Sequence, residues 1–305
     1  MRTQSRPTDP PPIRAVGADR RRLRRIAYLV AAVLVAAQLA LVAQPAAAAP
    51  ATISGLTIVH GASDTDSFDK SIFLECPDNQ VIVGGSPIIS TNPGVFARIS
   101  GMWAGITGNH GFLVLLAEEE EINSPGNWVL FLTAVCAQRP PGYEIVPAPL
   151  TTSAASANVT ATCPAGKQLL AGFGIVQNDE RNVILDDIQP SMNLNSVTVN
   201  AFADETGVTR PWDLFATAAC ANPVAGLQLQ FLGSALNSMN KGYTVVFCPS
   251  GKRAISRGGT IDSGFGQVEW VGSFIDSNSA GFLAFEDQTG FSGNWSQTAY
   301  VMCVT

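Results

Sequence analysis

Apolar residues beyond residue 50 follow the pattern of β-strands and not that of helices. Residues 128–136 form a nearly continuous apolar run rich in β-formers, as in a strand buried on both faces. The corresponding residues 295–303 are more mixed. No segment beyond residue 50 keeps a helical apolar period over three turns. The pattern therefore predicts an all-β protein.

Further short segments combine β-formers with flanking turn residues. We expect strands at 72–76, 80–83, 111–116, 198–202, 243–248, 269–275 and 281–285. Asn-Pro-Gly at 92–94, Ser-Pro-Gly at 124–126 and Ser-Gly-Asn at 292–294 predict turns between strands.

One set of landmarks occurs three times in the same order. Each copy opens with Cys-Pro and closes with a cysteine that a tryptophan precedes by eight residues. The opening cysteines are Cys76, Cys163 and Cys248, the closing cysteines are Cys136, Cys220 and Cys303, and the tryptophans are Trp128, Trp212 and Trp295. Because eight is even, each tryptophan projects from the same face of its strand as its cysteine. The landmarks predict three homologous β repeats.

The N-terminal segment has the organisation of an export signal. Arginines cluster within residues 20–25, a mostly apolar run follows to residue 43, and small residues lead to Ala48. A membrane anchor that is not cleaved is the alternative, because about 18 apolar residues are just enough to span a bilayer. We expect a signal peptide at 1–48, followed by repeats at 49–140, 141–225 and 226–305, with no membrane contact after cleavage.

Six cysteines in an exported chain predict disulfides. Two pairings respect the repeat symmetry. In the first, the bonds Cys76–Cys136, Cys163–Cys220 and Cys248–Cys303 each close one repeat, which suits three tandem sandwich- or barrel-like units. In the second, bonds join neighbouring repeats within a single threefold, β-prism-like body. We favour the first and retain the threefold body as an alternative fold.

Charge excludes one class of partner. Residues 50–305 keep 10 of the 18 basic and 22 of the 24 acidic residues, a formal net charge of −12. A chain of this charge without a basic stripe repels phosphate backbones, so we expect no nucleic-acid partner.

The repeat resembles a family of uncharacterised secreted bacterial proteins of actinobacterial type. The resemblance rests on Cys-Pro-x-Gly-Lys at 163–167 and 248–252, a following glycine cluster and Trp-x7-Cys, and the first copy departs from it at 78–80. It covers the mature chain and implies an extracellular location, with no activity to transfer. In repeat number alone, the layout is also similar to the vitelline-membrane outer-layer β-prism.

Two tryptophans are candidates for ligand binding. The Trp-x7-Cys tryptophans are expected to pack against the disulfides in the core. Trp103 and Trp270 have no tryptophan counterpart in the second repeat, so they are candidates for a binding surface, with core packing as the alternative.

Acidic residues recur just before each tryptophan strand, at 118–121, 204–205 and 286–287. In a ring of repeats they would gather at one end and attract Ca²⁺, although solvated turns are the simpler interpretation. We therefore expect no metal site and no cofactor.

Catalytic motifs were not found. The mature chain has two histidines, neither in a metal-binding spacing, and no G-x-S-x-G sequence. These observations favour a secreted, non-enzymatic binding or structural protein whose partner is an envelope glycan or an extracellular protein. A glycan-active hydrolase with two distant carboxylates and a protein-interaction or inhibitory module are the alternatives.

Overall fold

The computed structural model describes residues 50–92, 95–119 and 126–305. The expected signal peptide and parts of the predicted turns at 92–94 and 124–126 lie outside these residues. Pro50–Thr305 form one compact unit. The described residues form strands and no helix. No membrane-spanning helix is therefore found among them. The predicted all-β class is confirmed.

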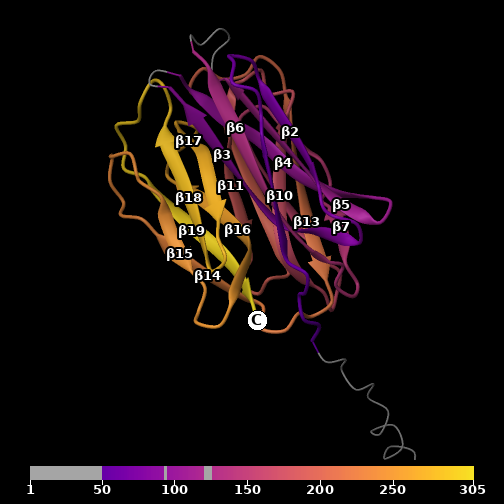
Figure 1. The fold of residues 1–305 in the computed structure, drawn as a ribbon. Helices are drawn as coiled ribbons and strands as arrows, with labels where there is room; N and C mark the ends of the chain where they lie inside the picture. Colours follow the sequence, from indigo (N-terminus) through magenta and orange to yellow (C-terminus); the bar gives the residue numbers. More distant parts are fainter. Residues whose placement is uncertain (1–49, 93–94, 120–125) are drawn as a thin grey trace, which may run out of the picture. The chain divides into compact units, whose positions relative to one another are not determined.

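The strands form three antiparallel sheets, each of which contains strands from two repeats (Figure 1). The sheet shared by repeats 1 and 3 has the order β1 (Thr57–Ala62), β6 (Trp128–Gln138), β3 (Gln80–Thr91), β17 (Val268–Ile275), β18 (Ser279–Glu286), β15 (Thr244–Phe247). The sheet shared by repeats 1 and 2 has the order β2 (Lys70–Glu75), β5 (His110–Glu119), β4 (Ala97–Thr107), β10 (Gln168–Gln177), β13 (Trp212–Ala221), β7 (Glu144–Pro147), and β8 (Thr151–Ser153) also pairs with β13. The sheet shared by repeats 2 and 3 has the order β14 (Gln228–Gly233), β19 (Ser296–Val304), β16 (Arg253–Asp262), β11 (Val183–Pro190), β12 (Ser196–Ala203), β9 (Ser156–Thr162).

Each repeat closes its own disulfide, as predicted. The bonds are Cys76–Cys136, Cys163–Cys220 and Cys248–Cys303. The sheets decide between the two versions of the fold, because the strands of every repeat divide between two sheets as in the threefold alternative. Self-closing disulfides and a shared threefold body therefore occur together, although we had expected a threefold body to need bonds between repeats.

Within each sheet, the strands of the two repeats are joined by one ladder pair of residues. These pairs are Ile88 with Gly272, Ile175 with Gly101, and Ile188 with Gly259. At each junction one of the two strands carries a β-bulge, at Trp270/Gly272, Ile99/Gly101 and Leu185/Asp187. Gly84 lies at a close approach of repeats 1 and 3, because a Cβ there would lie 1.9 Å from the carbonyl oxygen of Ile255.

One hydrophobic core joins all three sheets, and it contains the Trp-x7-Cys tryptophans. Trp128, Trp212 and Trp295 are at most 1% exposed. The expectation that these tryptophans are core residues is confirmed.

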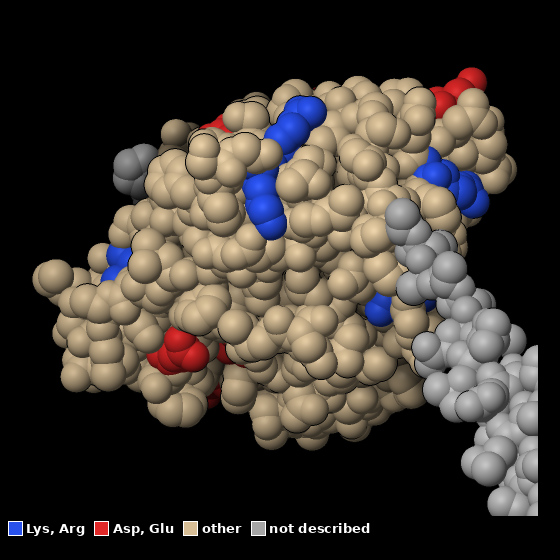
Figure 2. All heavy atoms as spheres, turned by 90° about the horizontal axis from the view of Figure 1, so that it is seen from below, with Lys and Arg blue, Asp and Glu red and all other residues tan. Residues whose placement is uncertain are grey.

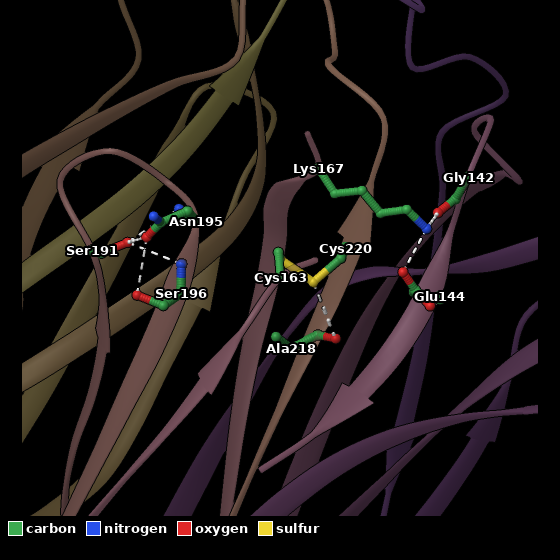
Figure 3. Close-up of a disulfide and its surroundings, with 9 residues drawn as sticks. All are labelled: Gly142, Glu144, Cys163, Lys167, Ser191, Asn195, Ser196, Ala218 and Cys220. Atoms are coloured by element: carbon green, nitrogen blue, oxygen red, sulfur yellow. Dashed lines mark hydrogen bonds and ion pairs between the residues drawn. A yellow bond between two sulfur atoms is a disulfide. The ribbon is translucent and has the colours of Figure 1, made fainter. Parts of the chain in front are cut away.

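The Cys-Pro turns lie at the end of the molecule that carries the C-terminus. Lys167 donates hydrogen bonds to the carbonyl oxygen of Gly142, at 2.7 Å, and to Glu144 (Figure 3). Lys252 reaches Gly226 in the same way, at 2.6 Å, and Gln80 replaces the lysine in repeat 1 and reaches Gly55. The Gly-Lys pair of repeats 2 and 3, and Gln80 in repeat 1, thus connect the Cys-Pro turn to the segment before each repeat.

The N-terminal residues of the described chain complete this ring of linkers. Ala51 donates a backbone hydrogen bond to Pro223, at 3.0 Å, and accepts one from Ala225, at 2.8 Å. Viewed toward this end, the surface shows few charged side chains, and they are scattered (Figure 2). The buried carboxylates described below lie at the opposite end, where the tryptophan strands begin.

Candidate functional site

Acidic groups from all three repeats gather around Arg98, at the end where the tryptophan strands begin. Arg98 is 1% exposed and lies on β4 opposite Glu118 of β5. Its guanidinium lies 3.4 Å from Glu118 of repeat 1, 3.6 Å from Asp204 of repeat 2 and 3.5 Å from Glu269 of repeat 3. One buried cation therefore links carboxylates of every repeat.

Two further buried carboxylates adjoin this group, which we call the apical cluster. Asp179, after β10, acts electrostatically on the Glu118 carboxyl and is 8% exposed. Asp287, after β18, acts electrostatically on Glu269 and is 4% exposed. The apical cluster thus comprises Arg98, Glu118, Asp179, Asp204, Glu269 and Asp287.

Carboxylates outnumber cations in the apical cluster, and this excess shows in their protonation. Burial, with a smaller contribution from Asp179, raises the pKa of Glu118 to about 8 against the opposing influence of Arg98. Burial also raises the pKa of Glu269 to about 7, again against the influence of Arg98. The pKa values of Asp204 and Asp287 are raised by burial too. The cluster therefore retains protons near neutral pH.

A cleft of about 550 Å³ opens beside the apical cluster, where β3 and β17 separate beyond their one paired position. Its lining is mostly apolar with a few polar groups, as in many small-molecule sites. The apolar residues are Ile89, Val95, Phe96, Ala97, Val271, Leu283 and Phe285, and the polar residues are Thr91, Asn92, Asn240, Glu269 and Glu286. Glu269 belongs to both the cleft and the apical cluster.

The other cleft carboxylate is held by the core of repeat 3. Glu286 accepts a hydrogen bond from the Trp295 indole, at 3.1 Å. It pairs with Val268 across β17 and β18, whereas Glu269 pairs with Phe285. Because neighbouring positions on a strand face opposite sides of a sheet, Glu269 and Glu286 project in opposite directions.

Neither of the predicted binding tryptophans is among the residues that line this cleft. Trp103 lies half-buried on β4, and Trp270 is 2% exposed, with its ring facing Phe282 and the Arg257 guanidinium. Trp270 occupies the residue before the bulge on β17, and Ile99 occupies the equivalent position on β4. Ile99 is also buried, so Trp270 fills a core position of the repeat and does not offer its face to a ligand from solvent.

The predicted acidic turns do come together for Glu118, Asp204 and Asp287, while Glu120 and Glu121 lie outside the described residues. Among the described residues, no group of three or more His, Cys, Asp or Glu has the arrangement of a metal site.

A repeated five-residue sequence was missed. Asp66 and Asn237 begin turns that pair with Trp128 and Trp295, and each turn ends in a lysine. Lys70 contacts Asp66 and lies 4.9 Å from the centre of the Trp128 ring, and Lys241 lies 4.0 Å from that of Trp295. The printed sequences Asp-Ser-Phe-Asp-Lys at 66–70 and Asn-Ser-Met-Asn-Lys at 237–241 could have revealed this device.

Comparison with known proteins gives no further assignment. No protein-family model matches the chain, and no curated protein matches its sequence. The three disulfides indicate an oxidising environment such as the extracellular space.

Proposed function

We propose that this chain is a secreted, non-enzymatic binding protein that holds an envelope glycan in the cleft between β3 and β17. The export signal expected at 1–48 and the three disulfides support the extracellular location. The observation that carries the proposal is the cleft itself, whose volume and mixed lining suit a small part of a larger ligand.

The lining offers both kinds of contact that a sugar ring makes, apolar contacts and hydrogen bonds. Phe96 and Phe285 are partly exposed, at 36% and 40%, and provide apolar faces for the C–H side of a pyranose. Asn92, Asn240 and Glu269 provide hydrogen-bond partners for hydroxyl groups.

The carboxylates of the cleft favour binding over hydrolysis. A glycosidase needs two carboxyl groups that flank one glycosidic bond. Glu269 and Glu286 project from opposite faces of β17 and β18, and Glu286 is bonded to Trp295. This pair therefore lacks the arrangement of a hydrolytic dyad.

Calorimetry with the purified protein, residues 50–305, tests the proposal. The probes are tetra-N-acetylchitotetraose and the disaccharide of N-acetylglucosamine and N-acetylmuramic acid. We expect at least one of them to bind and Phe285→Ala to weaken binding at least tenfold. Phe247→Ala is the matched control, because Phe247 is an exposed phenylalanine of the same sheet outside the cleft. Equal losses in both variants, or no binding of either probe, would refute the proposal.

A further inference from the structure

The floor of the cleft carries an excess of negative groups. Glu269 lines the cleft, whereas Arg98, its buried cationic partner, does not. Glu118, Asp179 and Asp204 share the single charge of Arg98 with Glu269, and Asp287 also acts on Glu269. Arg181, which donates a hydrogen bond to the carbonyl oxygen of Glu119, is paired with Asp69. Glu269, although only 2% exposed, is therefore the member of the apical cluster that a ligand in the cleft can approach.

Hydrogen bonding within the apical cluster is also incomplete. One carboxylate oxygen of Asp179, one of Asp287 and one guanidinium nitrogen of Arg98 have no hydrogen-bond partner among the described residues. All three side chains are more than nine-tenths buried. Buried charges such as those of the apical cluster are poorly screened by solvent, so they influence a charged group placed at the cleft floor.

We propose that the cleft selects ligands in which a protonated amine is carried on a sugar or other apolar-faced framework, with the amine placed against Glu269. The inference rests on the proposed binding role of the cleft. The walls contact the framework, and Glu269 accepts hydrogen bonds from the ammonium group. An anionic group is disfavoured at the same place, because Arg98 is shielded behind the carboxylate.

The protonation of Glu269 supplies an independent readout. Burial holds its pKa at about 7, so part of the Glu269 population carries a proton at neutral pH. An ammonium group placed beside the carboxyl favours its charged form. Binding of an amine therefore releases protons from the cluster, whereas binding of a neutral sugar does not.

Matched ligand pairs test the inference by calorimetry at pH 7 in two buffers of different ionisation enthalpy. The first pair is chitotetraose with free amines and tetra-N-acetylchitotetraose, and the second is benzylamine and benzyl alcohol. We expect the amine of at least one pair to bind tenfold or more tightly than its neutral counterpart, with proton release. Preference in the first pair alone identifies an amino sugar, and preference in the second alone identifies an aromatic amine.

Variants place the effect at Glu269. Glu269→Gln is expected to reduce the amine preference to within twofold, whereas Asp276→Asn, just after the far end of β17, keeps it. Thermal unfolding verifies that each variant is folded. If Glu269→Gln does not fold, Phe285→Ala provides the second test, because it must weaken both members of the preferred pair.

The outcomes separate this inference from the proposed function. Equal binding of the free and N-acetylated sugars, sensitive to Phe285→Ala, overturns the amine preference and leaves the glycan-binding role intact. Benzylamine bound at the cleft with no sugar bound overturns the glycan and retains the amine preference. Tighter binding of both neutral ligands overturns the inference directly.

Discussion

Replacement of Glu269 by glutamine should change how the stability of the protein depends on pH. Burial raises the pKa of this carboxyl from 4.5 to about 7, and nearby Asp287 adds to the shift while Arg98 opposes it. A carboxyl whose pKa is higher in the folded state binds its proton more tightly there than in the unfolded chain. Its contribution to stability is therefore fully present below pH 4.5 and is lost as the pH rises through 7.

The size of the effect follows from the shift. A difference of about 2.5 pKa units at about 1.4 kcal/mol per unit corresponds to about 3 kcal/mol. Glutamine is neutral at every pH, and its amide oxygen can still accept the hydrogen bond from Arg98. As the pH rises from 4.5 to 8, the free energy of unfolding of Glu269→Gln should thus increase by about 3 kcal/mol relative to that of the natural protein.

Urea unfolding followed by tryptophan fluorescence measures this difference, at constant ionic strength and with the disulfides intact. Asp276→Asn is the control, since Asp276 is exposed at the other end of β17. The free energy of unfolding of Asp276→Asn should depend on pH in the same way as that of the natural protein. If the difference in unfolding free energy between Glu269→Gln and the natural protein changes by less than about 0.5 kcal/mol over this pH range, the account of the apical cluster is wrong.

Three further predictions concern the fold. Replacing Cys76 and Cys136 together by serine should lower the free energy of unfolding by about 4 kcal/mol, because the bond closes a loop with a sequence separation of 60; a loss under about 1 kcal/mol in urea unfolding would contradict this. Gly84→Ala should cost about 2 kcal/mol or more, whereas Gly242→Ala, where a Cβ meets nothing within 4 Å, should be nearly neutral in the same assay. The isolated segment 141–225 should be unfolded by circular dichroism and NMR, because its strands lack their partners in β4 and β16; a folded monomer would refute the importance of the shared sheets.

The repeats made the core and the disulfides predictable from the sequence. Trp128 and Cys136 stand an even number of residues apart on one apolar strand, which places both in the interior. The sharing of sheets was not predictable to the same degree. The ladder between repeats consists of one residue pair per sheet, such as Ile88 with Gly272, and no local pattern specifies which repeat a strand will meet.

The candidate site was harder to predict because it is assembled from distant segments. Phe96, Asn240 and Phe285 line one cleft, yet they are far apart in the chain and share no motif. Trp270 appeared to be a surface candidate because the second repeat lacks it. Its position is nevertheless a core position in each repeat, where Ile99 and Leu185 are also buried, so a missing counterpart carried no information about exposure.

Because each repeat supplies strands to two sheets, the number of copies in this fold is fixed at three. A solenoid can gain or lose a repeat at its end, since each unit contacts only its neighbours. Here the third repeat pairs with both the first and the second, so deletion of one copy leaves two sheets incomplete and a fourth copy has no place to join. A chain with a single repeat could complete the same three sheets only as a trimer, and the present chain is the covalently linked equivalent of that assembly.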